Sequence, residues 1–590
     1  MNHPCHNIKK KILSRIICPV LVILMSMMTS LTGYTQVNEG VQAETWRVTE
    51  LRFTSSTNYE NLGTEGVRMD VRFVHKKTGT TMVRPAFWDG ENLFLVRFAP
   101  TRPGIWTWIT ECPQDASLNG IKGQLKCRKY KGTLPIYRHG FVQVMPGRKY
   151  MTYADGTPFF YLGDTHWGLY LEEYDQPGPH AGNTGATSHF KYLVDRRVDQ
   201  GFTVYQSEPI GAKFNLADGR VDQKDIDGLR QADKYYQYIA DKGLVHANAE
   251  FFFSSSMSAK LASDDAALAV LSRYWVARFG AYPVMWTLAQ EIDNDFYHER
   301  GSNKVYDFTC NPWVKVAEFL HHEDAYSHPL SGHQENTIFT GVTGKGVEEE
   351  ANADNGGASV FLPEEVTQRT GHNWWAAQWS PGLTKTNNPE TIRDYWTSSR
   401  PAINYEGRYC GLWTKDFGSR AQGWISFLSG FAGYGYGAID IWLYQSNYDV
   451  NTISNDGMEN ITPEDKRKPW SESVEYPSAL QMRYLRNLLE SMEWWNLAPV
   501  LRDDKAFQDQ SEAFAYARTK DVHLLYFYAR NTLTGSITDL KPSARYTLTW
   551  YNPRTGQHMK AQILKANESG VLSLPQKPDD LDWVMVLKEK

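Results

Sequence analysis

Pro283-Val-Met-Trp-Thr-Leu-Ala-Gln-Glu-Ile-Asp-Asn-Asp295 joins a short apolar run directly to a group of acidic side chains. Residues 284–289 are predicted to form a strand buried on both faces, because such strands read as continuous apolar runs. Gln290 and Glu291 follow this run at once. A carboxylate at the carboxyl end of a buried parallel strand occupies the place where barrel enzymes carry their catalytic groups. One segment of this kind fits a solvated acidic loop after a core strand equally well.

The same pattern recurs in seven further segments, each an apolar stretch that runs into a polar residue. They follow one another at intervals of roughly 30–45 residues, close to the length of one strand–helix unit of a barrel. Alternation of strands with helical patterns predicts a parallel sheet. The sequence therefore predicts an α/β fold, a (β/α)8 TIM barrel over residues 141–498. The residues that mark the other seven strand ends are Asp164, Glu208, Glu250, Glu335, Gln378, Glu406 and Asp440.

Short alternating runs flank this central region on both sides. Several short strands separated by frequent turns are typical of a β-sandwich. We therefore predict an N-terminal β-sandwich over residues 40–140 and a C-terminal β-sandwich over residues 499–590. The predicted strands are 46–54, 67–75, 93–98 and 105–110 in the first, and 522–529, 546–551 and 583–587 in the second.

The composition narrows the classes of function. The chain has 590 residues, 41% hydrophobic and 22% charged, with a net charge of −5 that indicates no surface for nucleic acid. Its 20 Trp and 33 Tyr either fill large cores or present flat rings on which sugar rings can stack. The sequence has no His-Glu-x-x-His pattern, no Gly-x-Ser-x-Gly elbow and no phosphate loop. We therefore expect no zinc-hydrolase or esterase chemistry, no cofactor and no metal.

The first 36 residues are predicted to be a signal peptide. Lys9 to Lys11 and Arg15 are basic, residues 16–28 are almost entirely apolar, and a small, polar stretch follows. An apolar run of this length is typical of a secretory signal and short for a membrane span. We expect a periplasmic or secreted protein without a transmembrane helix. In such a compartment Cys112 and Cys127 could form a disulfide, or both could remain buried thiols.

Two glutamates suggest acid–base chemistry on a sugar. Glu291 ends the predicted fourth strand and Glu406 the seventh. Cleavage of a glycosidic bond requires two carboxyl groups, one to protonate the leaving oxygen and one to attack the anomeric carbon or activate water. Strand ends of one barrel can bring such groups together although they are far apart in sequence.

Residues 159–442 resemble a family of secreted bacterial barrel enzymes that includes apiosidases, within the clan of retaining (β/α)8 glycosidases. The resemblance implies that Glu291 is the general acid/base and Glu406 the nucleophile. The clan usually has Asn where this chain has Gln290, and the apiosidase-type branch favours Asp where it has Glu291. The segments that carry the resemblance are Tyr161-Leu-Gly-Asp-Thr-His-Trp167, Met285-Trp-Thr-Leu-Ala-Gln-Glu291, Arg400-Pro-Ala-Ile-Asn-Tyr-Glu406 and Gly433-Tyr-Gly-Tyr-Gly437.

Other polar and aromatic residues near the predicted strand ends are candidates for substrate contact. Each of them could equally be structural, and we expect Tyr405 to be a core residue because neighbouring side chains of a strand point to opposite faces. The candidates are Asp164, His166, Trp167, Glu208, Glu250, Gln290, His333, Gln334, Trp375, Gln378 and Trp442.

The sequence thus predicts an exo- or endo-acting glycoside hydrolase with a retaining mechanism and a plant or microbial polysaccharide as substrate. Two alternatives remain open. One is a glycan-binding barrel without catalysis, and the other is an enzyme assisted by a metal at Glu291, Asp293 and Asp295. The retaining reading predicts that the carboxyl groups of Glu291 and Glu406 lie about 5–5.5 Å apart. No feature of the sequence indicates an oligomeric state.

Overall fold

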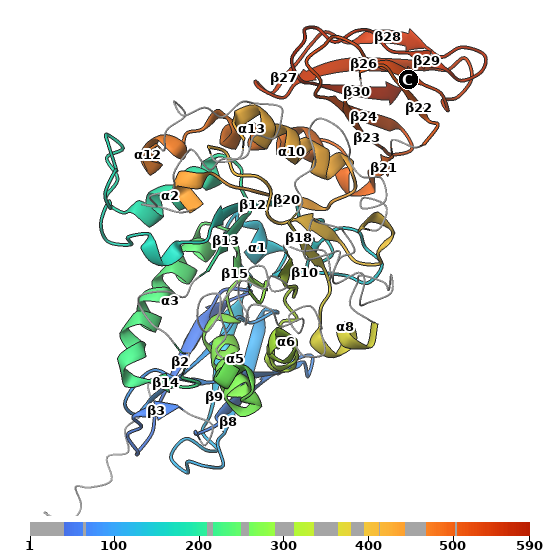
Figure 1. The fold of residues 1–590 in the computed structure, drawn as a ribbon. Coiled ribbons are helices and arrows are strands. Elements are labelled where there is room, and N and C mark those ends of the chain that lie inside the picture. Colours follow the sequence, from blue (N-terminus) through green and yellow to red (C-terminus); the bar gives the residue numbers. More distant parts are fainter. Residues whose placement is uncertain are drawn as a thin grey trace, which may run out of the picture.

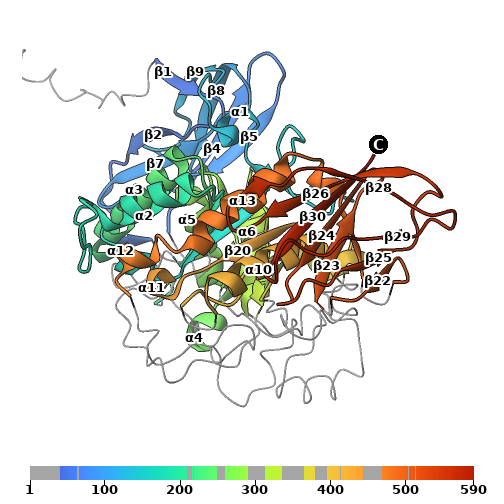
Figure 2. The same ribbon diagram turned by 90° about the horizontal axis from the view of Figure 1, so that it is seen from above.

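The central part of the chain is a parallel sheet with helices around it, and groups of mostly antiparallel strands adjoin it (Figure 1). The first of these groups comes from the N-terminal part of the chain and the second from the C-terminal part. Seen from above, the two groups lie at separate places beside the central helices (Figure 2). The computed structural model describes residues 40–62, 66–208, 216, 218–248, 259–289, 312–334, 364–378, 395–411, 414–442, 468–501, 504–511 and 513–590.

The parallel sheet contains eight strands in the order β16-β15-β13-β12-β20-β19-β18-β17. Almost every residue in these strands is buried, as expected for strands covered on both faces. Seven of the eight predicted segments therefore contribute a strand to one sheet, and the eighth strand, β20, comes just before the segment predicted for it. The strands are β12 (Tyr161–His166), β13 (Val204–Ser207), β15 (Val245–Asn248), β16 (Val284–Trp286), β17 (His333–Gln334), β18 (Trp375–Ala377), β19 (Ala402–Asn404) and β20 (Gly433–Tyr436).

The two outer strands of this order are themselves joined. Trp286 in β16 donates its backbone N–H to Pro329 O at 2.8 Å and accepts from Ser331 N at 2.8 Å. His333 N lies 3.3 Å from Ala289 O. These contacts connect β16 to the segment that enters β17, so the parallel sheet curls round and its carboxyl ends face a common space.

The eighth strand of the sheet lies earlier in the sequence than predicted. The sequence places a strand over residues 437–440, but β20 ends at Tyr436 and α11 (Ile439–Trp442) follows. Asp440 and Trp442 therefore belong to a short helix after the strand. Asp440 is buried and accepts hydrogen bonds from Ser473 Oγ at 2.7 Å and Tyr476 Oη at 3.4 Å.

Helices cover the outer face of the parallel sheet. The signals for the two ends of a helix are clear in α5. Asp264 caps its first turn by accepting a hydrogen bond from Ala267 N at 3.0 Å, and Gly280 follows its last residue. The helices are α1 (Pro135–Arg138), α2 (His189–Asp199), α3 (Ile226–Asp241), α4 (Ala259–Ala262), α5 (Asp265–Phe279), α6 (Pro312–Glu323), α8 (Glu364–Thr370), α10 (Asp416–Leu428), α11, α12 (Trp470–Ser473) and α13 (Pro477–Glu490).

The N-terminal strands form a five-stranded and a three-stranded sheet that share a core with α5. Within this core Phe73 and Phe98 stack with ring centroids 3.9 Å apart. The sheets contain β1 (Val41–Glu44), β9 (Lys122–Arg128), β8 (Gly104–Glu111), β4 (Asp70–His75) and β5 (Thr81–Pro85), and β2 (Thr49–Thr54), β7 (Leu93–Phe98) and β6 (Phe87–Trp88).

Two two-stranded ladders complete this half of the chain. One of them, β3 with β14, connects the N-terminal strands to the segment before α3. The ladders are β3 (Asn61–Leu62) with β14 (Val221–Asp222), and β10 (Val142–Gln143) with β11 (Thr152–Tyr153).

The C-terminal strands form a seven-stranded sheet that packs on α10 and α13, and a three-stranded sheet that shares a core with the seven-stranded one. Arg420 of α10 binds Asp582 through two hydrogen bonds of 2.8 Å, and this buried pair fixes the sheets to the central part. The strands are β21 (Ala498–Val500), β23 (Phe514–Arg518), β24 (Val522–Phe527), β30 (Trp583–Glu589), β26 (Arg545–Asn552), β27 (Gln557–His558) and β28 (Gln562–Lys565), and β22 (Phe507–Asp509), β25 (Gly535–Ile537) and β29 (Leu572–Ser573).

Cys112 and Cys127 are buried free thiols, so the second of the two alternatives for this pair holds. Burial raises the pKa of the Cys112 thiol to about 11 and that of Cys127 to about 12.

None of the described helices is both long and apolar enough to cross a membrane.

Candidate active site

Glu406 lies at the carboxyl end of the parallel sheet, two residues beyond β19, with its carboxyl group buried. Its Oε1 accepts a hydrogen bond from Trp167 Nε1 at 3.2 Å and a very short one from the Tyr409 hydroxyl. Trp167 Nε1 also lies 2.9 Å from Tyr409 Oη, so the three groups form a closed triangle. These contacts hold the Glu406 carboxyl in one orientation at the rim of the sheet.

The other carboxyl oxygen of Glu406 faces His333 from β17. His333 Nε2 lies 3.2 Å from Glu406 Oε2. Burial lowers the pKa of His333 to about 3, so its imidazole is neutral at neutral pH. The imidazole also packs on the Trp167 indole, with ring centroids 5.7 Å apart. The structure therefore brings together three of the predicted site residues, Trp167, His333 and Glu406, from three different strand ends.

Tyr405 lies directly beneath this group and is fully buried, as predicted. Its hydroxyl lies 3.2 Å from Thr287 Oγ1, just beyond the end of β16. Burial raises the pKa of Tyr405, and the negative charges of Glu406 and Glu208 raise it further. Glu208 follows β13 and is itself 8% exposed. The carboxyl groups of Glu208 and Glu406 thus both influence one buried phenol at the same end of the sheet.

The backbone beside Glu406 is held by an amide that crosses the interior of the sheet. Gln206 of β13 donates from Nε2 to Tyr405 O at 2.9 Å and accepts at Oε1 from Tyr161 Oη at 3.0 Å. A side chain at Gly163 would place Cβ 1.9 Å from Gln206 Oε1, and one at Gly435 would lie 1.9 Å from Tyr405 O. Glycine at these two positions therefore leaves the space in which Gln206 reaches β19.

Asp164 and His166 of β12, both predicted as substrate contacts, form ion pairs with protein partners. His166 lies between two carboxylates, with Nε2 2.5 Å from Asp164 Oδ2 and Nδ1 2.6 Å from Glu172 Oε1. Arg197 of α2 donates to Asp164 Oδ2 at 2.6 Å. The four groups are at most 1% exposed. This network fixes the backbone immediately before Trp167.

The charge of His166 gives a testable pH dependence of stability. Burial alone would lower the pKa of His166, but attraction to Glu172 and Asp164 outweighs burial and raises it to about 9. Because the unfolded imidazole titrates near pH ~6.5, the folded state binds an extra proton between pH 6.5 and 9. This contribution is complete below about pH 6.5 and is lost as the pH rises through about 9.

Stability should therefore fall by up to about 3 kcal/mol between pH 6.5 and 9.5. The measurement is urea unfolding across this range for the wild type and for His166→Gln. The variant should be less stable at pH 6.5 and should lose much of the slope. An equal slope in both proteins would show that His166 is not charged in the folded state.

Of the remaining predicted residues, the structure describes Trp375 and Gln378 in full. Trp375 of β18 is buried, donates from Nε1 to Ser398 Oγ at 2.7 Å and packs against His372 with ring centroids 5.2 Å apart. Its neighbour Trp374 lies on the inner face of the strand, where its ring centroid is 5.9 Å from that of Tyr405. Gln378 follows β18 at the same end of the sheet as Glu406. Glu250, Gln290 and Glu291 lie outside the described residues, as do the side chains of Gln334 and Trp442 and the acidic residues Asp293 and Asp295.

Tyr409 was not predicted, although its hydroxyl contacts both Glu406 and Trp167. It lies three residues beyond Glu406 in a loop, where the strand pattern that located Glu406 no longer applies. Its position close after the candidate nucleophile was the only available signal. Glu172 and Arg197 were missed for a similar reason, because they come from a turn and from a helix.

The family model described as "Apiosidase-like, catalytic domain" matches residues 145–496. The chain belongs to the apiosidase-like family. The match contains all eight strands of the parallel sheet and Glu406. Two shorter matches flank it. Residues 42–113 match a domain family of unknown function, and residues 500–588 match a family ascribed a collagen-binding role in a collagenase.

Solved structures support the same fold for this apiosidase-like chain. A Bacteroides vulgatus protein assigned to the glycoside hydrolases aligns with a TM-score of 0.63 at 16% identity, over 93% of this chain and 100% of its own. A family 5 glycoside hydrolase from Bacteroides vulgatus aligns with a TM-score of 0.54 at 18% identity, over 78% of this chain and 95% of its own. No curated protein matches the sequence. At these identities the likeness establishes a glycoside hydrolase fold.

Proposed function

We propose that this apiosidase-like protein is a retaining glycoside hydrolase that acts on a plant or microbial polysaccharide. The proposal places a closed (β/α)8 barrel between two β-sandwiches and assigns it to the periplasm or the exterior of the cell. The observation that carries it is the buried Glu406 carboxyl at the carboxyl end of the parallel sheet, oriented by Trp167 and Tyr409. A group held in this way is suited to attack a substrate atom above the sheet.

In the proposed mechanism Glu406 is the nucleophile and Glu291 the general acid/base. A carboxylate oxygen of Glu406 attacks the anomeric carbon, while Glu291 protonates the oxygen of the departing sugar and the glycosidic bond breaks. Glu291 then takes a proton from water, whose oxygen attacks the anomeric carbon and releases Glu406. The product keeps the anomeric configuration of the substrate.

The residues around Glu406 have distinct parts in this proposal. Trp167 and Tyr409 donate hydrogen bonds to Oε1 of Glu406, the oxygen that does not attack the sugar. Both hydrogen bonds can remain when the ester forms and this oxygen loses its negative charge. The neutral His333 beside the other oxygen adds no charge that would neutralise the nucleophile. In this proposal Glu208, at the end of β13, accepts a hydrogen bond from a sugar hydroxyl.

The decisive experiment is hydrolysis of a panel of polysaccharides, with the anomeric configuration of the first product followed by proton NMR. The panel contains pectin, arabinoxylan, galactomannan and laminarin. We expect one of them to be cleaved with retention, and Glu291→Gln to lower the rate by roughly 10²-fold or more, the scale of general acid–base catalysis. An inverted product would overturn the retaining mechanism. Binding of a glycan without cleavage by the wild type would overturn the hydrolase proposal in favour of a binding protein.

A further inference from the structure

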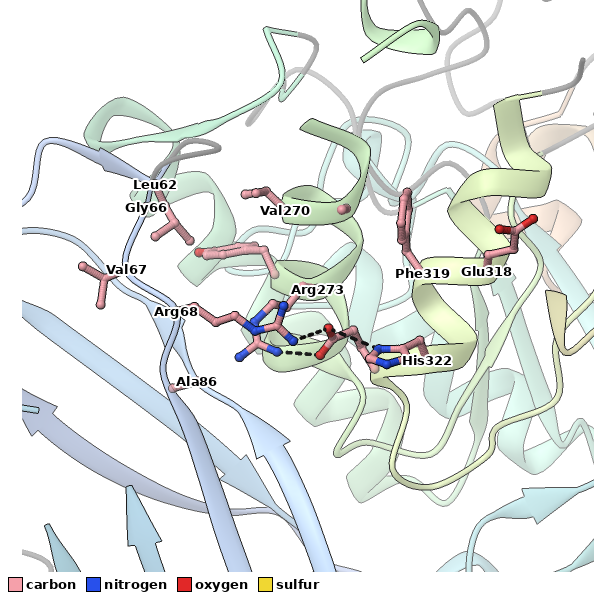
Figure 3. A pocket seen from close by; sticks show the side chains of 13 residues that line it. Leu62, Gly66, Val67, Arg68, Ala86, Val270, Arg273, Glu318, Phe319 and His322 are labelled. Atoms are coloured by element: carbon pink, nitrogen blue, oxygen red, sulfur yellow. Dashed lines mark hydrogen bonds and ion pairs between the residues drawn. The ribbon is translucent and has the colours of Figure 1, made fainter. Parts of the chain in front are cut away.

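A cavity of about 500 Å³ lies between the N-terminal strands and helices α5 and α6, on the outside of the parallel sheet. Its walls come from the N-terminal strand region and from helices of the central part of the chain. Val67 and Arg68 precede β4, Val270 and Arg273 belong to α5, and Phe319 belongs to α6. Figure 3 shows the Phe319 ring on one side of this groove and Val67 and Arg68 on the other. The cavity is within the size range of small-ligand sites.

Part of the lining of the groove is apolar. Phe319 and Val67 are only partly buried and pack against the core that the N-terminal strands share with α5. Tyr274 beneath them is 2% exposed, with its hydroxyl turned inward to Trp88 O at 3.0 Å. The Phe319 ring is therefore a partly accessible flat surface on a rigid base.

The rest of the lining includes a cross-linked set of charged groups from both sides of the groove. Glu323 accepts from Arg68 Nη2 at 2.9 Å and from Arg273 Nη1 at 2.5 Å. Arg273 is further fixed by Asp70 Oδ1 at 2.8 Å, and Glu318 pairs with Arg369 at 2.7 Å. The side chains of Arg68 and His322 are 53% and 77% exposed. Donors and acceptors thus stand side by side in fixed positions at the edge of the groove.

The balance of these charges indicates the kind of ligand. The two arginines of this charged set are offset by Glu323 and Asp70, so the groove has no excess of either sign to select a phosphate, a sulfate or a polycation. A hydroxyl group both donates and accepts, and it therefore matches a surface that alternates the two. A sugar unit combines such hydroxyls with an apolar face of C–H groups that can pack on an aromatic ring.

We propose that this groove, called here the α5–α6 groove, binds a segment of a neutral polysaccharide chain at a distance from the Glu406 site. The proposal rests on the proposed function for its choice of ligand, because the same molecule would then cut the chain that the groove holds. Phe319 provides the stacking surface, and Arg68 with Glu323 binds the hydroxyls. A second attachment raises the effective concentration of polymer at the site without altering the chemistry there.

The test compares groove variants in full-length protein that carries Glu406→Ala, so that no polymer is degraded. Binding to arabinoxylan, galactomannan and laminarin is measured by retardation in polysaccharide-containing native gels. Phe319→Ala and Arg68→Ala should each weaken retardation by the polymer that binds by about tenfold, equivalent to ~1.4 kcal/mol. Leu480→Ala is the matched control, because Leu480 is an exposed apolar residue of another helix, at 40%.

A second arm uses the Glu406-containing protein on the cleaved polymer and on a short chromogenic glycoside of the same sugar. The groove variants should lower kcat/KM on the polymer only. Unchanged retardation by both variants, with unfolding temperatures equal to that of the control, would overturn the groove proposal. A shift in oligomeric state in light scattering, with retardation intact, would assign the groove to contact between copies. Absence of hydrolysis in the wild type bears on the proposed function alone, since the gel arm still decides the groove.

Discussion

Replacing Glu406 by alanine should lower kcat on the cleaved polysaccharide by about 10³-fold, within the range that one positioned catalytic group contributes. The reason is geometric. Glu406 is the carboxyl that Trp167, Tyr409 and His333 surround, and no other described carboxyl group shares these partners. The shortened side chain leaves a space beside Trp167 without an atom that can form the glycosyl ester. Initial rates of reducing-sugar release measure the effect.

Small anions distinguish a missing nucleophile from a damaged site. Azide can occupy the space left by the carboxylate and attack the anomeric carbon from the same side as Glu406 would. Sodium azide should therefore restore a measurable rate to Glu406→Ala and give a glycosyl azide of inverted configuration. Glu472→Ala, which alters an exposed acidic residue of α12, is the control and should keep the wild-type rate. A Glu406→Ala protein with more than about a tenth of the wild-type kcat would refute the assignment of the nucleophile.

The parallel sheet was predictable because its strands carry a strong local signal. Buried strands such as β12 and β16 read as apolar runs that stop at a polar residue. Their regular spacing along the sequence indicated that they belong to one parallel sheet. The eighth strand was misplaced by a few residues. Gly437-Ala-Ile-Asp440 looked like the end of a strand, but a short apolar run does not separate strand from helix. The preceding Gly433–Tyr436, with its small residues against Tyr161, forms β20 instead.

The site was predictable only where its residues terminate strands. Trp167, His333 and Glu406 met that condition, and the structure brings them together. Trp375 shows the limit, because adjacent tryptophans occupy opposite faces of a strand and the sequence does not say which one faces inward. The sequence also does not indicate the protein partners of Asp164 and His166. Their charges are satisfied by Glu172 and Arg197, whose approach depends on the packing of a turn and α2 against β12.

The largest expected effect on stability comes from Asp233, which joins the N-terminal strands to the central part. From α3, Asp233 Oδ1 accepts from Arg97 Nη1 of β7 at 2.7 Å and from Arg278 Nε of α5 at 3.0 Å. Its Oδ2 accepts from Arg278 Nη2 at 2.6 Å. The desolvation of this carboxyl would raise its pKa, but the two guanidinium groups outweigh burial and lower it. Asp233 is therefore ionised at neutral pH, and its stabilising contribution is lost only as the pH falls below about 4.

Asp233→Ala should lower the free energy of unfolding at pH 7 by about 3 kcal/mol, the lower end of the cost of removing one partner from a buried ion pair, because the Asp233 side chain is 18% exposed while both arginines are buried. Arg278 has no exposed surface and Arg97 is 4% exposed, so neither guanidinium can turn to water when the carboxylate is gone. Glu50 and Asp89 still contact them, at 3.2 Å and 3.0 Å, and should keep the loss from being larger. Guanidinium chloride unfolding followed by tryptophan fluorescence measures the shift of the midpoint.

The matched control is Glu475→Ala, which removes the closer of two carboxylate partners of Arg196 in a solvent-accessible pair with contacts of 2.7 and 2.5 Å. Although its distances are as short as those of the Asp233 contacts, solvent screening should limit its effect to less than about 1 kcal/mol. The contrast isolates burial from geometry, because both pairs join an arginine to a carboxylate on another element. Similar losses in the two variants would show that the Arg97–Asp233–Arg278 cluster is solvated in the folded protein and does not fix the N-terminal strands to α3 and α5.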